Sequence, residues 1–71
     1  MRYHMRVVGQ VATIRGTVQS LNPQTGAFSV KFDVPLTGDD GVAVQTVGFV
    51  PDGTGGTVID QVWGLSWELI S

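Results

Sequence analysis

Short runs of alternating apolar and polar residues dominate this chain. The clearest is Ala27–Val34, in which Phe28, Val30, Phe32 and Val34 alternate with small or polar residues. A period of two residues is typical of a strand that buries one face. The run therefore predicts a strand whose phenylalanine face lies in a core.

Glycine and proline mark the turns between such runs. Asn22–Gly26 predicts a hairpin turn, because Pro23 fixes φ and Gly26 tolerates a left-handed backbone. We expect Pro35 to end the strand before it, since proline cannot donate to a β-ladder. Met5–Leu21 is predicted to be extended, with a turn or bulge at 12–13. Further strands are predicted at Val42–Val50, with a bend at Gly48, and at Glu68–Ile70. The segment Thr37–Gly41 has the composition of a loop.

The segment after residue 56 has two interpretations. Val58, Ile59, Val62 and Trp63 have the spacing of one or two helical turns, but the β-branched residues equally favour an edge strand. Residues 65–67 could form a 3₁₀ turn. We predict an all-β fold: a small barrel of five or six antiparallel strands in one domain, 1–71, with a short helical or 3₁₀ turn near the C-terminus.

Two parts of the chain resemble a known class of small barrel. Gly16–Leu21, the Pro23-Gln24-Thr25-Gly26 turn and Phe28–Phe32 resemble the central hairpin of SH3-like barrels, which implies that the predicted barrel is SH3-like. Leu65–Ile70 resembles their 3₁₀ turn and last strand. Tudor and KOW modules share this shape, and so do plasmid-borne type B dihydrofolate reductases. The resemblance covers about half of the chain, and it implies a shape more than an activity.

The reductase resemblance implies an alternative function. Val44-Gln45-Thr46-Val47 matches the first two residues of the Val-Gln-Ile-Tyr signature of those reductases, whose strand lines a pore between subunits. It would make Gln45 and Thr46 ligand-binding residues of a small-ligand or cofactor-binding enzyme. The chain departs from the family pattern because it lacks the tyrosine, and its only lysine, Lys31, is on another predicted strand.

Composition favours association with protein. Charged residues make up 14% of the 71-residue chain and hydrophobic residues 42%, whereas a stable small domain usually has a surface that is about 25–35% charged. We therefore expect another chain to cover part of the surface, through self-association or docking on a larger protein. Four Lys and Arg residues against six Asp and Glu disfavour nucleic-acid binding.

Aromatic residues are the candidate anchors of that interface. Trp63, Trp67 and Phe49 could bury apolar area against a partner, because tryptophan is enriched among interface hot spots. The alternative is that one or both tryptophans cap an open end of the barrel.

The remaining chemistry is sparse. The chain has no cysteine and one histidine, His4, which leaves no convergent catalytic set. Asp39 and Asp40 do not have the spacing of a calcium loop. We therefore expect no catalytic residues, metal or cofactor. The sequence contains no run of about 18 apolar residues, so we expect no membrane span and a cytoplasmic location.

Overall fold

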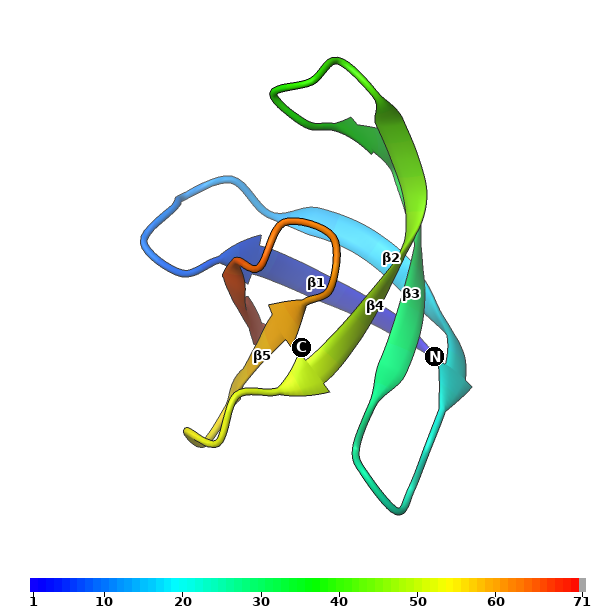
Figure 1. Cartoon of the computed structure of the whole chain (residues 1–71), viewed down its shortest axis with the longest axis vertical. Helices are drawn as coiled ribbons and strands as arrows, with labels where there is room; N and C mark the ends of the chain where they lie inside the picture. Colours follow the sequence, from blue (N-terminus) through cyan, green and yellow to red (C-terminus); the bar gives the residue numbers. More distant parts are fainter. Residues whose placement is uncertain (71) are drawn as a thin grey trace.

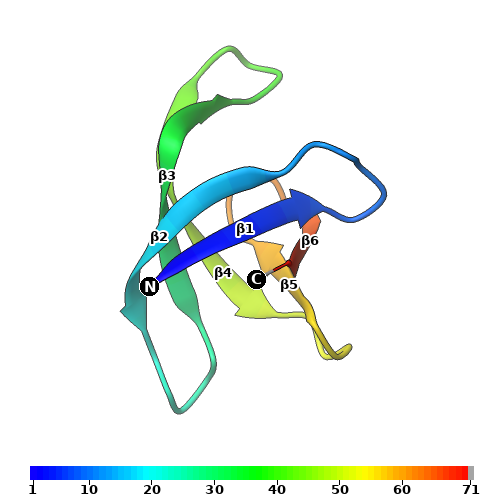
Figure 2. The ribbon, with the colours of Figure 1, turned by 180° about the vertical axis from the view of Figure 1, so that it is seen from behind.

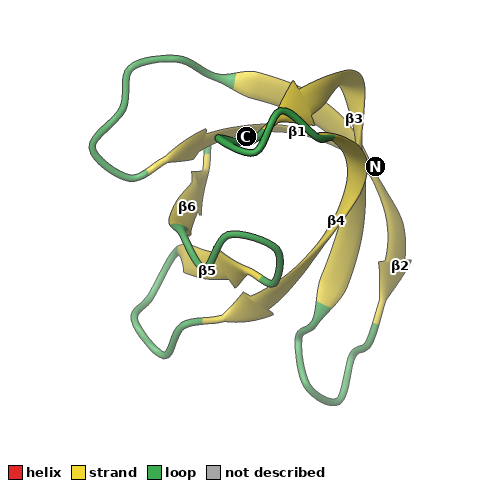
Figure 3. Ribbon diagram, turned by 45° about the horizontal axis from the view of Figure 1, so that its top comes forward, coloured by secondary structure: helices red, strands yellow, loops and turns green. Residues whose placement is uncertain are grey.

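The protein is a six-stranded antiparallel barrel. A computed structural model describes residues 1–70, and Figure 1 traces the chain through them. Each strand pairs with the next, and the last pairs with the first, so the sheet closes on itself (Figure 3). The strands are β1 (Arg2–Val7), β2 (Ile14–Leu21), β3 (Phe28–Thr37), β4 (Ala43–Pro51), β5 (Thr57–Asp60) and β6 (Ser66–Leu69). This confirms the predicted all-β barrel, with six strands.

Three aromatic side chains form the centre of the core. The rings of Phe32 and Trp67 stack with centroids 5.9 Å apart, and Phe49 meets Trp67 edge-on at 5.7 Å. Such pairs contribute about 0.5–1.5 kcal/mol beyond the apolar area they bury. The other buried apolar residues are Met5, Val30, Val47 and Val58. Phe32 and Val30 thus confirm the predicted core face of β3.

The hairpin between β2 and β3 has the predicted turn. The backbone N–H of Gly26 donates to the carbonyl of Asn22 at 2.8 Å, and Gly26 has a φ of 79°. That left-handed conformation favours glycine. The predicted irregularity at 12–13 is instead part of a loop between Val7 and Ile14, and Gly48 lies within a continuous β4.

Pro35 does not end β3, which continues to Thr37. The ladder between β2 and β3 stops at Gly16 and Phe32, so at Pro35 no β2 residue needs an N–H donor. The β3–β4 register also shifts between Lys31 and Leu36. The prediction was wrong because proline is tolerated on a strand edge.

Beyond this point, β3 and β4 leave the barrel wall as a two-stranded projection, which we call the arm (residues 36–44). It is the green hairpin that extends from the barrel in Figures 1 and 2. Leu36 pairs with Val44 and Thr37 with Ala43, and the loop at the tip corresponds to the predicted loop of residues 37–41.

The predicted helical turn is absent from the described residues. Residues 57–60 form β5 and pair with both β4 and β6. A short turn, residues 61–63, then leads to β6, and one hydrogen bond from the N–H of Gly64 to the carbonyl of Asp60 spans it. Of the two interpretations, the strand is the correct one for residues 57–60, but it is not an edge strand, because β5 is paired on both sides. The side chain of Asp60 explains why the chain turns after this strand.

Candidate binding groove

Among residues 1–70, Asp60 is the one buried charged or polar residue, with 1% of its surface exposed. Its Oδ1 accepts hydrogen bonds from the backbone N–H groups of Val62, Trp63 and Gly64. Its Oδ2 accepts a 3.2 Å bond from the N–H of Leu65. The indole N–H of Trp67 donates to the same Oδ2 at 2.7 Å. A buried carboxylate is tolerated only when its oxygens are satisfied in this way.

These bonds determine the shape of the β5–β6 turn (residues 61–65). Because one carboxylate collects four successive N–H groups, the chain curls around it and does not extend β5 or start a helix. The curl leaves Trp63 half-buried and Leu65 exposed at the barrel end. Asp60 therefore holds the two apolar side chains on which the site described next depends.

A groove of about 620 Å³ opens between this turn and the arm. Ile14, at the start of β2, and Leu36, in the arm, contribute aliphatic side chains, and Trp67 contributes to the lining from the core. Trp63 and Leu65 line the turn side, and the arm adds Thr37, Gly38, Asp39 and Asp40. The lining is thus mostly apolar, with two carboxylates in the arm loop.

Gly38 allows the arm to approach Trp63 closely. A Cβ atom added at Gly38 would lie 2.6 Å from the indole Nε1 of Trp63 and 3.2 Å from Oδ1 of Asp40. Real Cβ contacts are longer, so any larger residue would displace the indole or the arm. The arm and the turn, which are far apart in sequence, therefore meet at this glycine.

Asp39 and Asp40 are exposed beside this apolar lining. Oδ1 of Asp40 accepts the N–H of Val42 at 3.0 Å, which shapes the loop. Within residues 1–70, the ion pairs are Arg2 with Asp33 and Arg6 with Glu68. Neither Asp39 nor Asp40 therefore has a cationic partner in the described part of the chain, and the groove has an anionic side.

The three predicted interface residues lie in two different environments. Phe49 is 1% exposed and Trp67 2%, so both are core residues in the described chain, and of the two only Trp67 also contributes to the groove lining. The predicted exposed interface around Phe49 and Trp67 is therefore not present in this subunit. The physical reason is that both fill the barrel centre, where Trp67 packs against Phe32 and Phe49. The alternative prediction, that a tryptophan caps an open end of the barrel, does not describe Trp67 either. Trp63 lies in the groove wall.

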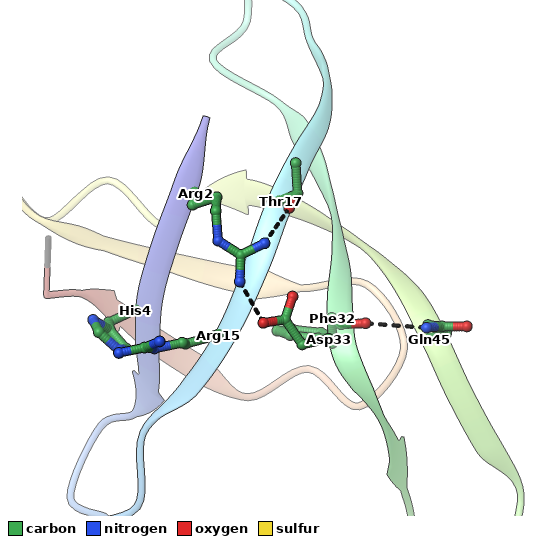
Figure 4. A network of polar contacts seen from close by, with 7 residues as sticks. All are labelled: Arg2, His4, Arg15, Thr17, Phe32, Asp33 and Gln45. Carbon is green, nitrogen blue, oxygen red and sulfur yellow. Dashed lines mark hydrogen bonds and ion pairs between the residues drawn. The ribbon is translucent and has the colours of Figure 1, made fainter.

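Gln45 and Thr46 are both exposed on β4 and lie outside the groove lining. The side-chain amide of Gln45 donates to the carbonyl of Phe32 at 3.2 Å, across the irregular stretch of the β3–β4 ladder (Figure 4). Neighbouring residues of a strand point to opposite faces, so these two side chains do not converge on one ligand within a subunit. Their predicted role in a site between subunits stays a prediction.

His4 lies on the outside of β1, where the guanidinium of Arg15 approaches its ring (Figure 4). In the same cluster, Arg2 donates to Thr17 at 3.1 Å and pairs with Asp33. Among the described residues, no three His, Cys, Asp or Glu side chains gather as a metal site would require. The described residues also contain no helix that is long and apolar enough to cross a membrane.

Sequence reasoning missed Asp60, Ile14, Leu36 and Leu65. The signal for Asp60 was present: an aspartate four residues before a glycine, in Asp60-Gln61-Val62-Trp63-Gly64, is typical of a turn in which the side chain bonds to the following backbone. The other three are ordinary apolar residues whose exposure depends on where the arm and the turn lie.

Comparison of the chain with protein-family models, with curated proteins and with solved structures found no match. The resemblance to SH3-like barrels therefore stays a prediction. The functional interpretation below is based on the geometry of the groove.

Proposed function

We propose that this protein is a binding module whose groove receives a segment of a partner protein that carries apolar side chains next to a lysine or arginine. The observation that supports this most directly is the position of Trp63. Its indole is half-buried in the groove wall and in close approach to Gly38, while the core is completed without it by Trp67, Phe32 and Phe49.

The apolar lining of the groove supports the proposal that the ligand carries apolar side chains. Leu65 is 44% exposed, and Ile14 and Leu36 are half-buried beside it. A partner side chain inserted between Trp63 and these residues would remove apolar surface from water on both molecules. Burial contributes about 25 cal/mol per Å² before the costs of association are subtracted, and a tryptophan anchor concentrates that gain.

The carboxylates of Asp39 and Asp40 support the proposal that the ligand carries a lysine or arginine. Asp39 and Asp40 have no cationic partner among residues 1–70, and both line the same groove. A lysine or arginine on the ligand would be attracted to this side. Because the carboxylates are exposed, their main effect should be on association rate, salt dependence and the choice of partner.

A peptide selection tests this proposal. A random library of displayed 12-residue peptides is selected on the folded protein, and the selected peptides are then titrated by tryptophan fluorescence. We expect a consensus of two or more apolar residues with a neighbouring Lys or Arg, and we expect Trp63→Ala to weaken binding about tenfold or more, as hot-spot truncation does.

The paired variant Asp39→Asn/Asp40→Asn should weaken binding at low salt and have little effect at high salt. Asp52→Asn, which removes one carboxylate outside the groove lining, is the control for each single variant, Asp39→Asn and Asp40→Asn. Because Asp52 accepts hydrogen bonds from Thr54 and Thr57, circular dichroism is used to check that this control is folded. Selected peptides without a basic residue, or peptides that bind Trp63→Ala as well as the wild type, would contradict the proposed function.

A further inference from the structure

The loop between β1 and β2 (residues 8–13) exposes apolar side chains that the barrel does not use. It projects from the barrel as the blue loop in Figure 2. Val11 is 89% exposed and Val8 49%, and the loop contains no charged residue. Two exposed valines in an uncharged loop form an apolar projection, and contact with a second surface would remove it from water.

Arg15, shortly after this loop, has no acidic partner within the described chain. It is exposed near the start of β2. The two ion pairs within residues 1–70 use Arg2 and Arg6, whereas the guanidinium of Arg15 donates through Nε to Nε2 of His4 at 2.5 Å (Figure 4). The loop and the start of β2 thus present apolar side chains close to an arginine whose charge no carboxylate of residues 1–70 balances.

The groove has the complementary chemistry. Trp63 and Leu65 give it an apolar wall, and Asp39 and Asp40 form its anionic side without a cationic partner among residues 1–70. A single subunit does not bring the loop into the groove, because Val11 stays 89% exposed and is not among the lining residues. A contact between the two therefore requires another molecule.

We infer that the groove receives the β1–β2 loop of a second copy of this chain. Val11 of one copy then lies against Trp63 of the other, and Arg15 lies beside Asp39 and Asp40. This inference rests on the proposed function, since it identifies the apolar and basic partner segment as part of the same chain.

The loop and the groove lie at the same end of the barrel, so the contact forms twice. Ile14 directly follows the loop and lines the groove. The N–H of Val8 donates to the carbonyl of Ser66 at 2.9 Å, and Ser66 follows the groove residue Leu65. A patch that contains both halves of a contact is self-complementary about a two-fold axis. We therefore expect a closed dimer in which each copy inserts its loop and receives the other.

The two parts of this contact have different roles. Burial of Val11 against Trp63 should supply most of the affinity, whereas the exposed charges should determine which surfaces meet. The contact area is small, so the dimer should form only at high protein concentration.

Charge reversal tests which surfaces meet. Arg15→Glu places a glutamate beside the two aspartates of the groove, and Asp39→Lys/Asp40→Lys places two lysines beside Arg15. Sedimentation velocity over a wide concentration range should detect dimer for the wild type and monomer for each of these variants. The variant that combines all three substitutions should dimerise again, because opposite charges then face each other. Misfolding cannot produce such a rescue.

Lys31→Glu is the matched control for Arg15→Glu. Lys31 is exposed on β3 and lies outside the groove lining, so the same change of charge there should leave the dimer intact. Val11→Ser, in the exposed loop, should abolish the dimer as Trp63→Ala does. The inference is overturned if the wild type is monomeric at every concentration, if Val11→Ser or Arg15→Glu still dimerises, or if the combined variant stays monomeric.

Peptide binding separates this inference from the proposed function. Val11→Ser leaves the groove lining unchanged, so the monomer should bind the peptides selected from the library at least as tightly as the wild type does. Peptide binding by a wild type that never dimerises would overturn this inference alone. If neither a peptide nor a second copy occupies the groove, both are contradicted.

Discussion

The indole N–H of Trp67 donates a 2.7 Å hydrogen bond to Oδ2 of Asp60, and both side chains are buried. This bond links β6 to the end of β5 inside the barrel. The same carboxylate holds the backbone of the β5–β6 turn. The core and one wall of the groove thus depend on a single side chain.

Replacement of Asp60 by asparagine should destabilise the barrel. The amide keeps the shape of the side chain, but its NH₂ group cannot accept a hydrogen bond, so some of the five donors lose their partner. Bonds to a buried charge contribute about 1.5–3 kcal/mol each to stability, and we expect a loss of about 3 kcal/mol in the free energy of unfolding, measured by urea denaturation.

Asp39→Asn is the control for that measurement. Asp39 is exposed, and its replacement should change the free energy of unfolding by no more than about 0.5 kcal/mol. If Asp60→Asn were as stable as Asp39→Asn, the carboxylate would not be what holds the turn.

Local patterns predicted those parts of the fold that depend on local chemistry. Alternation identified β3, because Phe28, Val30 and Phe32 differ sharply from the residues between them. The turn at Asn22–Gly26 could be identified because proline and glycine each restrict or permit a particular backbone conformation. These features depend on neighbouring residues in the chain.

Features that depend on residues distant in sequence could not be predicted. Trp63 and Trp67 are equally hydrophobic, and contacts with residues distant in sequence distinguish them. Trp67 bonds to Asp60 and stacks on Phe32 in the core, whereas Trp63 lies beside Gly38 of the arm. Pro35 is compatible with β3 only because β2 has no ladder partner there. The groove likewise forms from three separate segments, which begin near Ile14, Leu36 and Trp63.

The two tryptophans should therefore respond differently to replacement by phenylalanine. Trp67→Phe removes a core contact and leaves Oδ2 of Asp60 without its indole donor, so it should cost about 2–4 kcal/mol of unfolding free energy. Trp63→Phe, in the groove wall, should cost less than about 1 kcal/mol. Urea denaturation of both variants checks this, and equal losses would contradict the assignment of Trp67 to the core and Trp63 to the groove.

Gly38→Ala should alter the groove and leave the barrel intact. The added methyl would lie 2.6 Å from Nε1 of Trp63, so the indole must move away from the arm. We expect a shifted Trp63 fluorescence maximum, measured in a Trp67→Phe background, with the far-ultraviolet circular dichroism unchanged. Gly55→Ala is the control, because a Cβ atom at that position meets no neighbour. Gly41→Ala is not suitable, because Gly41 has a φ of 78°, which favours glycine.

Asp52 should produce an acid-sensitive component of stability. Hydrogen bonds from the side chain of Thr57, and then from the side chain and backbone of Thr54, lower the pKa of Asp52 below its ordinary value of 3.8. Folding therefore favours the ionised form. The resulting stabilisation is complete above the unfolded-state pKa and is lost as the pH falls through the lower folded-state pKa.

Asp52→Asn should reduce this acid dependence. Its unfolding free energy should fall less steeply toward low pH than that of the wild type. Urea denaturation between about pH 2 and pH 6, the range in which carboxylates titrate, measures this. Asp39→Asn again serves as the comparison. An unchanged slope in Asp52→Asn would mean that the two threonines do not stabilise the carboxylate in solution.

The central claim is that the groove between the arm and the β5–β6 turn binds a partner segment. The most direct measurement is an amide and indole nitrogen–proton NMR titration of the protein with a selected peptide that carries apolar residues next to an arginine. We expect the largest shifts at Ile14, at residues 36–40, at Leu65 and at the indole N–H of Trp63. Shifts confined to the outer face of β1 and β2, around His4 and Arg15, would contradict the claim.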